Sequence, residues 1–186
     1  MRRRRPKIEA PTGPPDAAAA MEVALRFLGT RPRTRRELTL RLRRASVAEP
    51  IVERTLERLT ELGYVDDLGF ARWWAEQRDR HAPRGRRLLE AELRQRGVPR
   101  EVIEQYRAEY DEPERAPEDE ALPGTEADRA RDVLDRHLRG RPLPADRRAL
   151  QRIGMFLMRR GFDPDTVRSV LRDPASDSGP AQPGDH

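Results

Sequence analysis

Cysteine is absent from this chain of 186 residues, which excludes a disulfide framework and thiolate metal sites and fits a reducing cytoplasm. Long apolar runs are also absent, because no stretch reaches the roughly 18 apolar residues that a membrane-spanning helix needs. The arginine cluster at residues 2–5 leads into proline-rich sequence and not into the apolar centre of a signal peptide. The sequence therefore predicts a soluble, cytoplasmic protein with no membrane partner.

Lysine is nearly absent as well. Lys7 is the only one, so a folded domain of this chain has no lysine for a phosphate-binding loop or a Schiff base. No glycine-rich nucleotide fingerprint occurs, and His81, His137 and His186 lie far apart without the spacing of metal ligands. These absences predict a protein that is not an enzyme and that uses no cofactor, no metal and no small-molecule substrate.

Arginine is what the chain has in excess. The 38 basic residues outnumber the 33 acidic ones, for a net charge of +5. The excess is uneven, because residues 1–110 carry 25 basic and 17 acidic side chains, whereas residues 111–125 carry 1 and 6. A basic surface of this kind is expected to meet a polyanion or an acidic protein face.

Helix start and stop signals divide the chain at short intervals. Asp66 or Asp67 can cap a helix, Pro99 suits a first helical turn, and Gly29 and Gly97 suit the left-handed residue that ends a helix. Together with apolar residues at helical spacing, these signals predict nine helices, at about residues 17–28, 34–45, 50–62, 67–81, 86–96, 99–110, 126–139, 145–160 and 164–172.

The helices form an internal repeat. Each of three segments has a leucine at a helix end, a small residue four positions later, an apolar residue directly after it, and the first apolar residue of the next helix. The three sets are Leu42, Ser46, Val47 and Val52; Leu93, Gly97, Val98 and Ile103; and Leu157, Gly161, Phe162 and Val167. Because such units stack on their neighbours, we expect an all-α protein of three tandem three-helix repeats that form a curved, elongated helical rod.

The predicted organisation has six parts. The repeats are expected at residues 17–65, 66–110 and 126–172. A basic disordered arm is expected at 1–16, an acidic proline-containing linker at 111–125 and a disordered tail at 173–186.

The central repeat carries a resemblance to a known family. Asp66-Asp67, Phe70-Ala71, Trp74, Gly85, Leu93 and Gly97 resemble the central repeat of the RecX family of recombinase regulators, and Gly161-Phe162 resembles its third-repeat signature. The resemblance implies structural roles for these residues. It also implies a monomeric regulator that binds the RecA–DNA filament and limits its extension, ATPase, strand-exchange and co-protease activities in DNA repair and the SOS response.

Two arginine concentrations are the predicted binding surface for such a partner or for DNA. Trp73 joins them, because Trp74 occupies the family's aromatic position and leaves Trp73 the less constrained of the two. The predicted contact residues are Arg31, Arg33, Arg35, Arg36, Arg43, Arg44, Trp73, Arg84, Arg86, Arg87, Arg94 and Arg96. Each arginine run can equally be a solvated helix face. A direct nucleic-acid-binding helical protein is the alternative function, and a scaffold for an acidic protein is a third.

Overall fold

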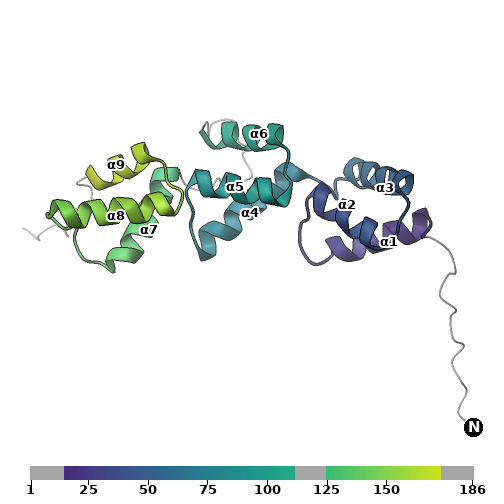
Figure 1. The fold of residues 1–186 in the computed structure, drawn as a ribbon, viewed down its shortest axis with the longest axis horizontal. Coiled ribbons are helices and arrows are strands. Elements are labelled where there is room, and N and C mark those ends of the chain that lie inside the picture. Colours follow the sequence, from purple (N-terminus) through teal and green to yellow (C-terminus); the bar gives the residue numbers. More distant parts are fainter. Residues whose placement is uncertain (1–14, 112–124, 173–186) are drawn as a thin grey trace, which may run out of the picture. The chain divides into compact units, whose positions relative to one another are not determined.

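The computed structural model describes residues 15–111 and 125–172, and within these residues it contains nine α-helices and no strand. The predicted basic arm, the centre of the acidic linker and the tail lie outside the described residues. The helices, labelled in Figure 1, are α1 (Ala17–Leu28), α2 (Arg35–Arg44), α3 (Glu49–Glu61), α4 (Asp67–His81), α5 (Arg86–Arg96), α6 (Arg100–Asp111), α7 (Glu126–Leu138), α8 (Arg147–Arg159) and α9 (Pro164–Arg172). We refer to α1–α3, α4–α6 and α7–α9 as the first, second and third repeats.

The two adjacent aspartates have different capping roles. Asp66 precedes α4, and its carboxylate accepts a hydrogen bond from the backbone N–H of Leu68 at 2.9 Å. The carboxylate of Asp67 instead accepts from the backbone N–H of Arg35, the first residue of α2, at 2.9 Å. Each aspartate therefore satisfies one N–H that helix geometry leaves without an intrahelical partner.

The repeat inferred from the sequence is reproduced in the backbone. Ser46, Gly97 and Gly161 have left-handed φ angles of 60°, 82° and 88°. In each repeat the apolar residue that follows donates its N–H to the leucine carbonyl five residues earlier, at distances of 3.1–3.3 Å. This bond is the one that closes a helix through a left-handed residue. The three repeats thus end their second helix in the same way.

The structure corrects the expectation for Gly29. Its φ is −62°, in the right-handed helical region, and its N–H donates to the carbonyl of Leu25. Helix α1 therefore ends without a left-handed residue, and nothing at this position requires glycine on conformational grounds.

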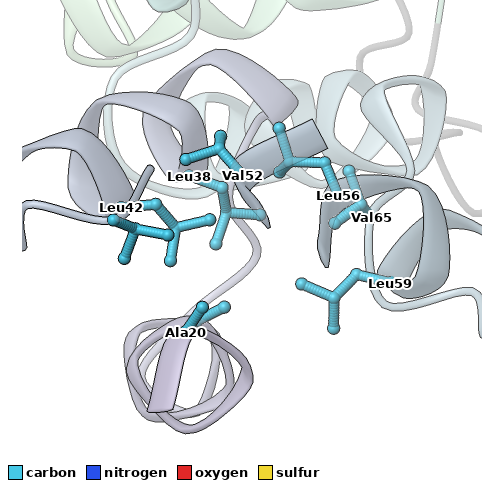
Figure 2. Packing of buried hydrophobic residues seen from close by; sticks show 9 residues of the cluster. Ala20, Leu38, Leu42, Val52, Leu56, Leu59 and Val65 are labelled. Atoms are coloured by element: carbon cyan, nitrogen blue, oxygen red, sulfur yellow. The ribbon is translucent and has the colours of Figure 1, made fainter. Parts of the chain in front are cut away.

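The chain forms two compact units, residues 1–70 and 71–186. The core of the first unit consists of residues from α1, α2 and α3 and of Val65. Figure 2 shows Leu38 and Leu42 of α2 and Val52, Leu56 and Leu59 of α3, all at most 3% exposed, directed toward a common centre. Ala20 completes this core from α1, where its small side chain permits close packing.

In the second unit, α7, α8 and α9 enclose their own core. It includes Val133, Leu134, Ile153, Leu157 and Phe162, each at most 6% exposed. Phe162, the residue after left-handed Gly161, is 1% exposed, so the family-motif phenylalanine contributes to packing. Leu93 and Ala71 in the second repeat are also fully buried, and Phe70 is 1% exposed.

The second and third repeats are joined by close backbone contact. The N–H of Gly85 donates to the carbonyl of Arg160 at 2.9 Å, and the N–H of Arg87 donates to the carbonyl of Gly161 at 3.2 Å. A Cβ at position 85 would lie only 2.1–2.3 Å from the backbone of Gly161 and Phe162. Gly85 is therefore required by space, because any side chain would push the repeats apart.

Side chains reinforce this junction. The carboxylate of Glu126, in the first turn of α7, accepts from the backbone N–H of Arg86 at 3.0 Å and of Asp163 at 3.3 Å. One acidic residue thus caps both α5 and α9, and the Arg86 guanidinium pairs with Asp163 at 2.7 Å. Nearby, the buried Arg129 guanidinium of α7 lies 3.6 Å from the carboxylate of Asp79 in α4.

Candidate partner-binding surface

The predicted arginines of the first repeat divide into anchored and exposed side chains. Arg31 pairs with Glu37 at 3.1 Å, and the Arg33 guanidinium lies 3.9 Å from the ring centre of Phe27. Arg35, at the start of α2, is exposed and its guanidinium approaches the Thr60 hydroxyl at 3.4 Å. Arg31 and Arg33 therefore hold the loop before α2 in place, which reduces their reach toward a partner.

Helix α2 presents the accessible part of this group. Arg36 and Arg44 are exposed and have no ion pair within the described residues. Arg43 is also exposed, and it pairs with the equally exposed Glu49. A surface pair of this kind contributes little and is easily exchanged for a new partner. Arg36 and Arg43 are seven residues apart and so lie on one face of α2.

Glu92 organises the aromatic and basic residues of the second repeat. Its carboxylate accepts from the indole N–H of Trp74 at 2.9 Å and from Arg78 at 2.8 Å, and it pairs with Arg84 at 3.0 Å. The Arg78 and Arg96 guanidinium groups lie 4.4 Å and 3.9 Å from the centre of the Trp74 ring. A half-buried carboxylate with several charged donors rigidifies the packing of α4 on α5. Trp74, Arg84 and Arg96 thus have an internal structural role.

Trp73 is partly buried, with its ring centre 6.0 Å from that of Trp74 and the planes inclined at 50°. Both tryptophans are therefore held by neighbouring side chains. Adjacent residues on a helix point in different directions, so one of the two rings could have been fully exposed. Neither ring is, and a contact role for Trp73 stays a prediction.

The remaining predicted arginines lie on α5. Arg94 pairs with Glu90 at 2.8 Å, while its side chain stays 59% exposed. Arg86 is only 25% exposed because it pairs with Asp163 in the junction. Arg87 is 68% exposed and its nearest acidic partner, Asp163, is 4.0 Å away. Of the predicted arginines on α5, Arg87 and Arg94 are therefore the ones that a partner can reach, and Arg86 stabilises the junction.

Two groups of charged residues are not among those predicted from the sequence. Arg148, Arg152 and Arg159 on α8 are exposed and lie on one helix face; their spacing of four and seven residues is a signal that could have identified them. The buried pair of Arg129 and Asp79 had no such signal, because 50 residues separate its members and each resembles an ordinary helix-surface charge.

Within residues 15–111 and 125–172, no group of three or more His, Asp or Glu side chains is arranged to hold a metal ion. In the same ranges, no helix has both the length and the apolar character to cross a membrane. The most basic surfaces are open helix faces, which suit a macromolecular partner better than a small molecule.

Most of the chain is similar to one known protein family. Residues 20–59, 66–106 and 125–171 match the models of the first, second and third three-helix domains of RecX. Regulatory protein RecX of Thermobifida fusca is 37% identical over 172 residues, covering 87% of this chain and 85% of that protein. Regulatory protein RecX of a Mycobacterium species, strain JLS, is 37% identical over 151 residues, covering 79% and 76%.

Solved structures agree in fold. The crystal structure of RecX from Lactobacillus salivarius superposes with a TM-score of 0.69 at 16% identity, over 84% of this chain and 94% of that one. A second crystal structure of a regulatory protein RecX gives 0.63 at 22% identity, over 84% and 72%.

Proposed function

Because this chain belongs to the RecX family of regulatory proteins, we propose that it regulates the RecA recombinase by binding the RecA–DNA filament and limiting its extension, ATPase, strand-exchange and co-protease activities. The match of three successive family domains in order along the chain is the observation that carries this proposal. A regulator of this kind needs a binding surface and no catalytic centre.

The exposed arginines of α2 and α5 are the proposed contacts. Arg36 and Arg44 have no ion pair within the described residues, and Arg87 and Arg94 are 68% and 59% exposed. Exposed arginines that face an acidic surface speed association and help to select the partner, and they contribute less to the affinity itself. We expect these residues to meet acidic side chains or phosphates of the filament.

The test is a titration of RecA ATPase on single-stranded DNA with the wild-type protein and two charge-reversal variants. The first variant is Arg36→Glu/Arg44→Glu, and the second is Arg87→Glu/Arg94→Glu. Arginine and glutamate have similar helix propensity, so both variants are expected to fold. Half-inhibition should need at least about tenfold more protein, equivalent to ~1.4 kcal/mol.

A matched control is available on α3. Arg54 is exposed and Arg58 is 59% exposed beside Glu61, so Arg54→Glu/Arg58→Glu makes the same change of charge on another helix of the first repeat. The control should inhibit as the wild type does. Equal inhibition by all four folded proteins would show that these arginines are not the contact, and failure of the wild type to inhibit would refute the proposed function.

The same surface raises the alternative of a direct nucleic-acid binder. Such a protein retains its affinity for bare DNA, with a steep dependence on salt, when no recombinase is present. A filament regulator binds much better when RecA and nucleotide are added. Measuring both affinities for the wild-type protein separates the two functions.

A further inference from the structure

The third repeat carries arginines that no nearby acidic side chain neutralises. Residues 139–160 contain seven arginines and a single acidic residue, Asp146, for a net charge of +6. The Asp146 carboxylate already caps α8 by accepting from the backbone N–H of Ala149 at 2.9 Å. None of the seven arginines has an ion pair within the described residues, whereas Arg168 on α9 pairs with Asp165. This positive charge is therefore available to an anionic partner.

Four side chains of α8 form one row, which we call the α8 stripe. Arg148, Arg152, Met155 and Arg159 follow the spacing 0, 4, 7 and 11, so they lie on one helix face over about 16 Å at ~1.5 Å per residue. They line an open depression of about 550 Å³. Arg152 and Arg159 also line a second depression, of about 610 Å³, whose other lining residues are mostly apolar. The stripe is thus accessible to an extended anionic chain along its whole length.

The protein contains an acidic stretch of matching charge. Residues 112–124, which we call the acidic segment, lie outside the described residues. They contain five acidic side chains and a single basic one, Arg115, for a net charge of −4. Three of the acids are consecutive, at positions 118–120. The charge of the acidic segment is therefore opposite in sign to that of residues 139–160 and similar in size.

The acidic segment is longer than the connection that it makes. Tyr106 of α6 and Arg129 of α7 line the same small cavity. The segment follows α6 five residues after Tyr106 and ends at Thr125, four residues before Arg129, which is ~6–8 Å of helix on each side. Thirteen residues of extended chain span about 40 Å. The excess length can therefore lie along a neighbouring surface.

The α8 stripe is within reach of this excess length. Glu126, two residues after the acidic segment, accepts a hydrogen bond from the backbone N–H of Asp163 at 3.3 Å. Because Asp163 is four residues after Arg159, the Arg159 end of the stripe lies close to the point where the segment ends. The acids at 118–120 precede Thr125 by five to seven residues, which is about 16–25 Å of extended chain. This length is comparable to that of the stripe.

We propose that the acidic segment binds the α8 stripe of its own chain, with the carboxylates of residues 118–120 paired with the arginines of the stripe. Attachment at both ends gives the segment an effective concentration in the millimolar range. Ion pairs that are weak individually are then sufficient to hold it in place. Nearby arginines on α7 are less suitable, because Arg131 already pairs with Asp128 at 3.0 Å. An external anion reaches the stripe only by displacing the segment.

This contact lies within one chain and requires neither RecA nor DNA. It goes beyond the proposed function, and the two proposals can fail independently. An acidic segment of another protein and a nucleic acid are the competing occupants of the stripe. The chain's own segment is favoured over both because it is always present beside the stripe and carries a matching charge.

The experiment is paramagnetic NMR on the full-length protein. Because the chain has no cysteine, Ala116→Cys creates a single attachment site for a nitroxide label within the acidic segment. Binding of the segment brings the label close to α8 and broadens the backbone amide signals there. The amides of Gln151 and Met155 report on the stripe, and those of Arg36 and Arg94 report on α2 and α5.

Three variants carry the same label. Glu118→Gln/Asp119→Asn/Glu120→Gln neutralises the segment, and Arg148→Gln/Arg152→Gln/Arg159→Gln neutralises the stripe. The control Arg136→Gln/Arg168→Gln/Arg172→Gln removes the same charge from exposed positions on α7 and α9 of the same repeat. Arginine and glutamine have similar helix propensity, and circular dichroism checks that each variant is folded.

Broadening at Gln151 and Met155 should fall at least about threefold in both neutralised variants, since each loses three ion pairs, and it should change little in the control. It should also fall in 1 M salt, where the Debye length is about 3 Å. Equal broadening in all four proteins would show that the label approaches α8 through its attachment alone. Stronger broadening on α2 or α5 would place the segment elsewhere, and either result would overturn the inference.

A synthetic peptide of residues 112–124 gives a second measurement. Added to the protein with the neutralised segment, the peptide should shift the α8 amide signals with a dissociation constant of about 1 mM or below, as the effective concentration requires. Neutralising the stripe in the same protein should weaken this binding at least about tenfold, equivalent to ~1.4 kcal/mol. Equal binding with and without the stripe would refute the contact. A response of these amides to oligothymidylate or to polyglutamate, but not to the peptide, would assign the stripe to an external anion and overturn the inference.

Discussion

The buried pair of Arg129 and Asp79 provides the sharpest test of how the second and third repeats hold together. The Arg129 side chain is 6% exposed and the Asp79 side chain is 22% exposed, and the 3.6 Å between them is long for a hydrogen bond. Tyr106 is buried beside them, and burial raises the pKa of its hydroxyl to about 12, so it stays neutral at any working pH. Arg129 and Asp79 differ in whether each can become neutral when the other is removed.

Removal of Asp79 leaves the buried guanidinium of Arg129 without its acidic partner, and an arginine side chain stays charged in a folded protein. Removing one member of a buried pair costs about 3–5 kcal/mol when the other stays charged. We therefore expect Asp79→Ala to lower the free energy of unfolding by about 3 kcal/mol, at the lower end because Arg129 has further contacts. The variant Arg129→Met should cost less, because it keeps an apolar stem in the site and the carboxylate that remains can take up a proton.

The pH dependence follows from the same asymmetry. Burial already raises the pKa of Asp79, and attraction to Arg129 opposes that rise. In Arg129→Met the opposing attraction is lost, so the folded state holds a proton more strongly than the unfolded state does. Its stability should therefore increase, relative to the wild type, as pH falls from 7 toward the unfolded pKa near 4. Asp79→Ala should show no such gain.

Urea unfolding followed by tryptophan fluorescence measures these differences, because both tryptophans of the chain lie on α4, the helix that carries Asp79. With a slope of about 1.5 kcal/mol per molar urea, a loss of 3 kcal/mol moves the midpoint by about 2 M. Equal loss of stability in the two variants, or no gain in the stability of Arg129→Met relative to the wild type at pH 5, would show that Arg129 and Asp79 do not form a buried charged pair.

Three further changes test the backbone assignments. Gly85→Ala should destabilise the second unit by at least about 2 kcal/mol in the same urea assay, because its Cβ would overlap the backbone of Gly161 and Phe162; an unchanged midpoint would contradict the close approach. Ser46→Gly should stabilise the first unit by up to about 1 kcal/mol in thermal unfolding, since Ser46 has a φ of 60° and glycine adopts this left-handed conformation without strain. Destabilisation by this change would show that the backbone at Ser46 is not strained. Asp67→Ala should destabilise α2 by about 1 kcal/mol through loss of the cap on Arg35, and hydrogen exchange at that amide should accelerate; unchanged exchange would show that the cap is not formed in solution.

Local rules were enough to predict the helices and the repeat. Val47, Val98 and Phe162, the apolar residues that follow the end of the second helix in each repeat, were identified from spacing alone. All three are buried, and each follows a left-handed residue. The expectation succeeded because a helix end is closed by bonds between residues at most five apart, so the sequence signal and the physical interaction span the same short distance. Gly29 shows the limit of the rule, because glycine tolerates the left-handed conformation without requiring it.

The sequence by itself determined that this protein is helical, repetitive, rich in arginine and related to RecX. Only the tertiary structure decided which arginines a partner can reach. Arg84, Arg86 and Arg96 looked like a basic surface, yet Glu92, Asp163 and the Trp74 ring hold them. On α8, Arg148, Arg152 and Arg159 have no acidic side chain among the described residues to pair with. Charge neutralisation depends on atoms within a few ångströms of one another, and those atoms come from residues that are 8 to 77 positions apart in the chain.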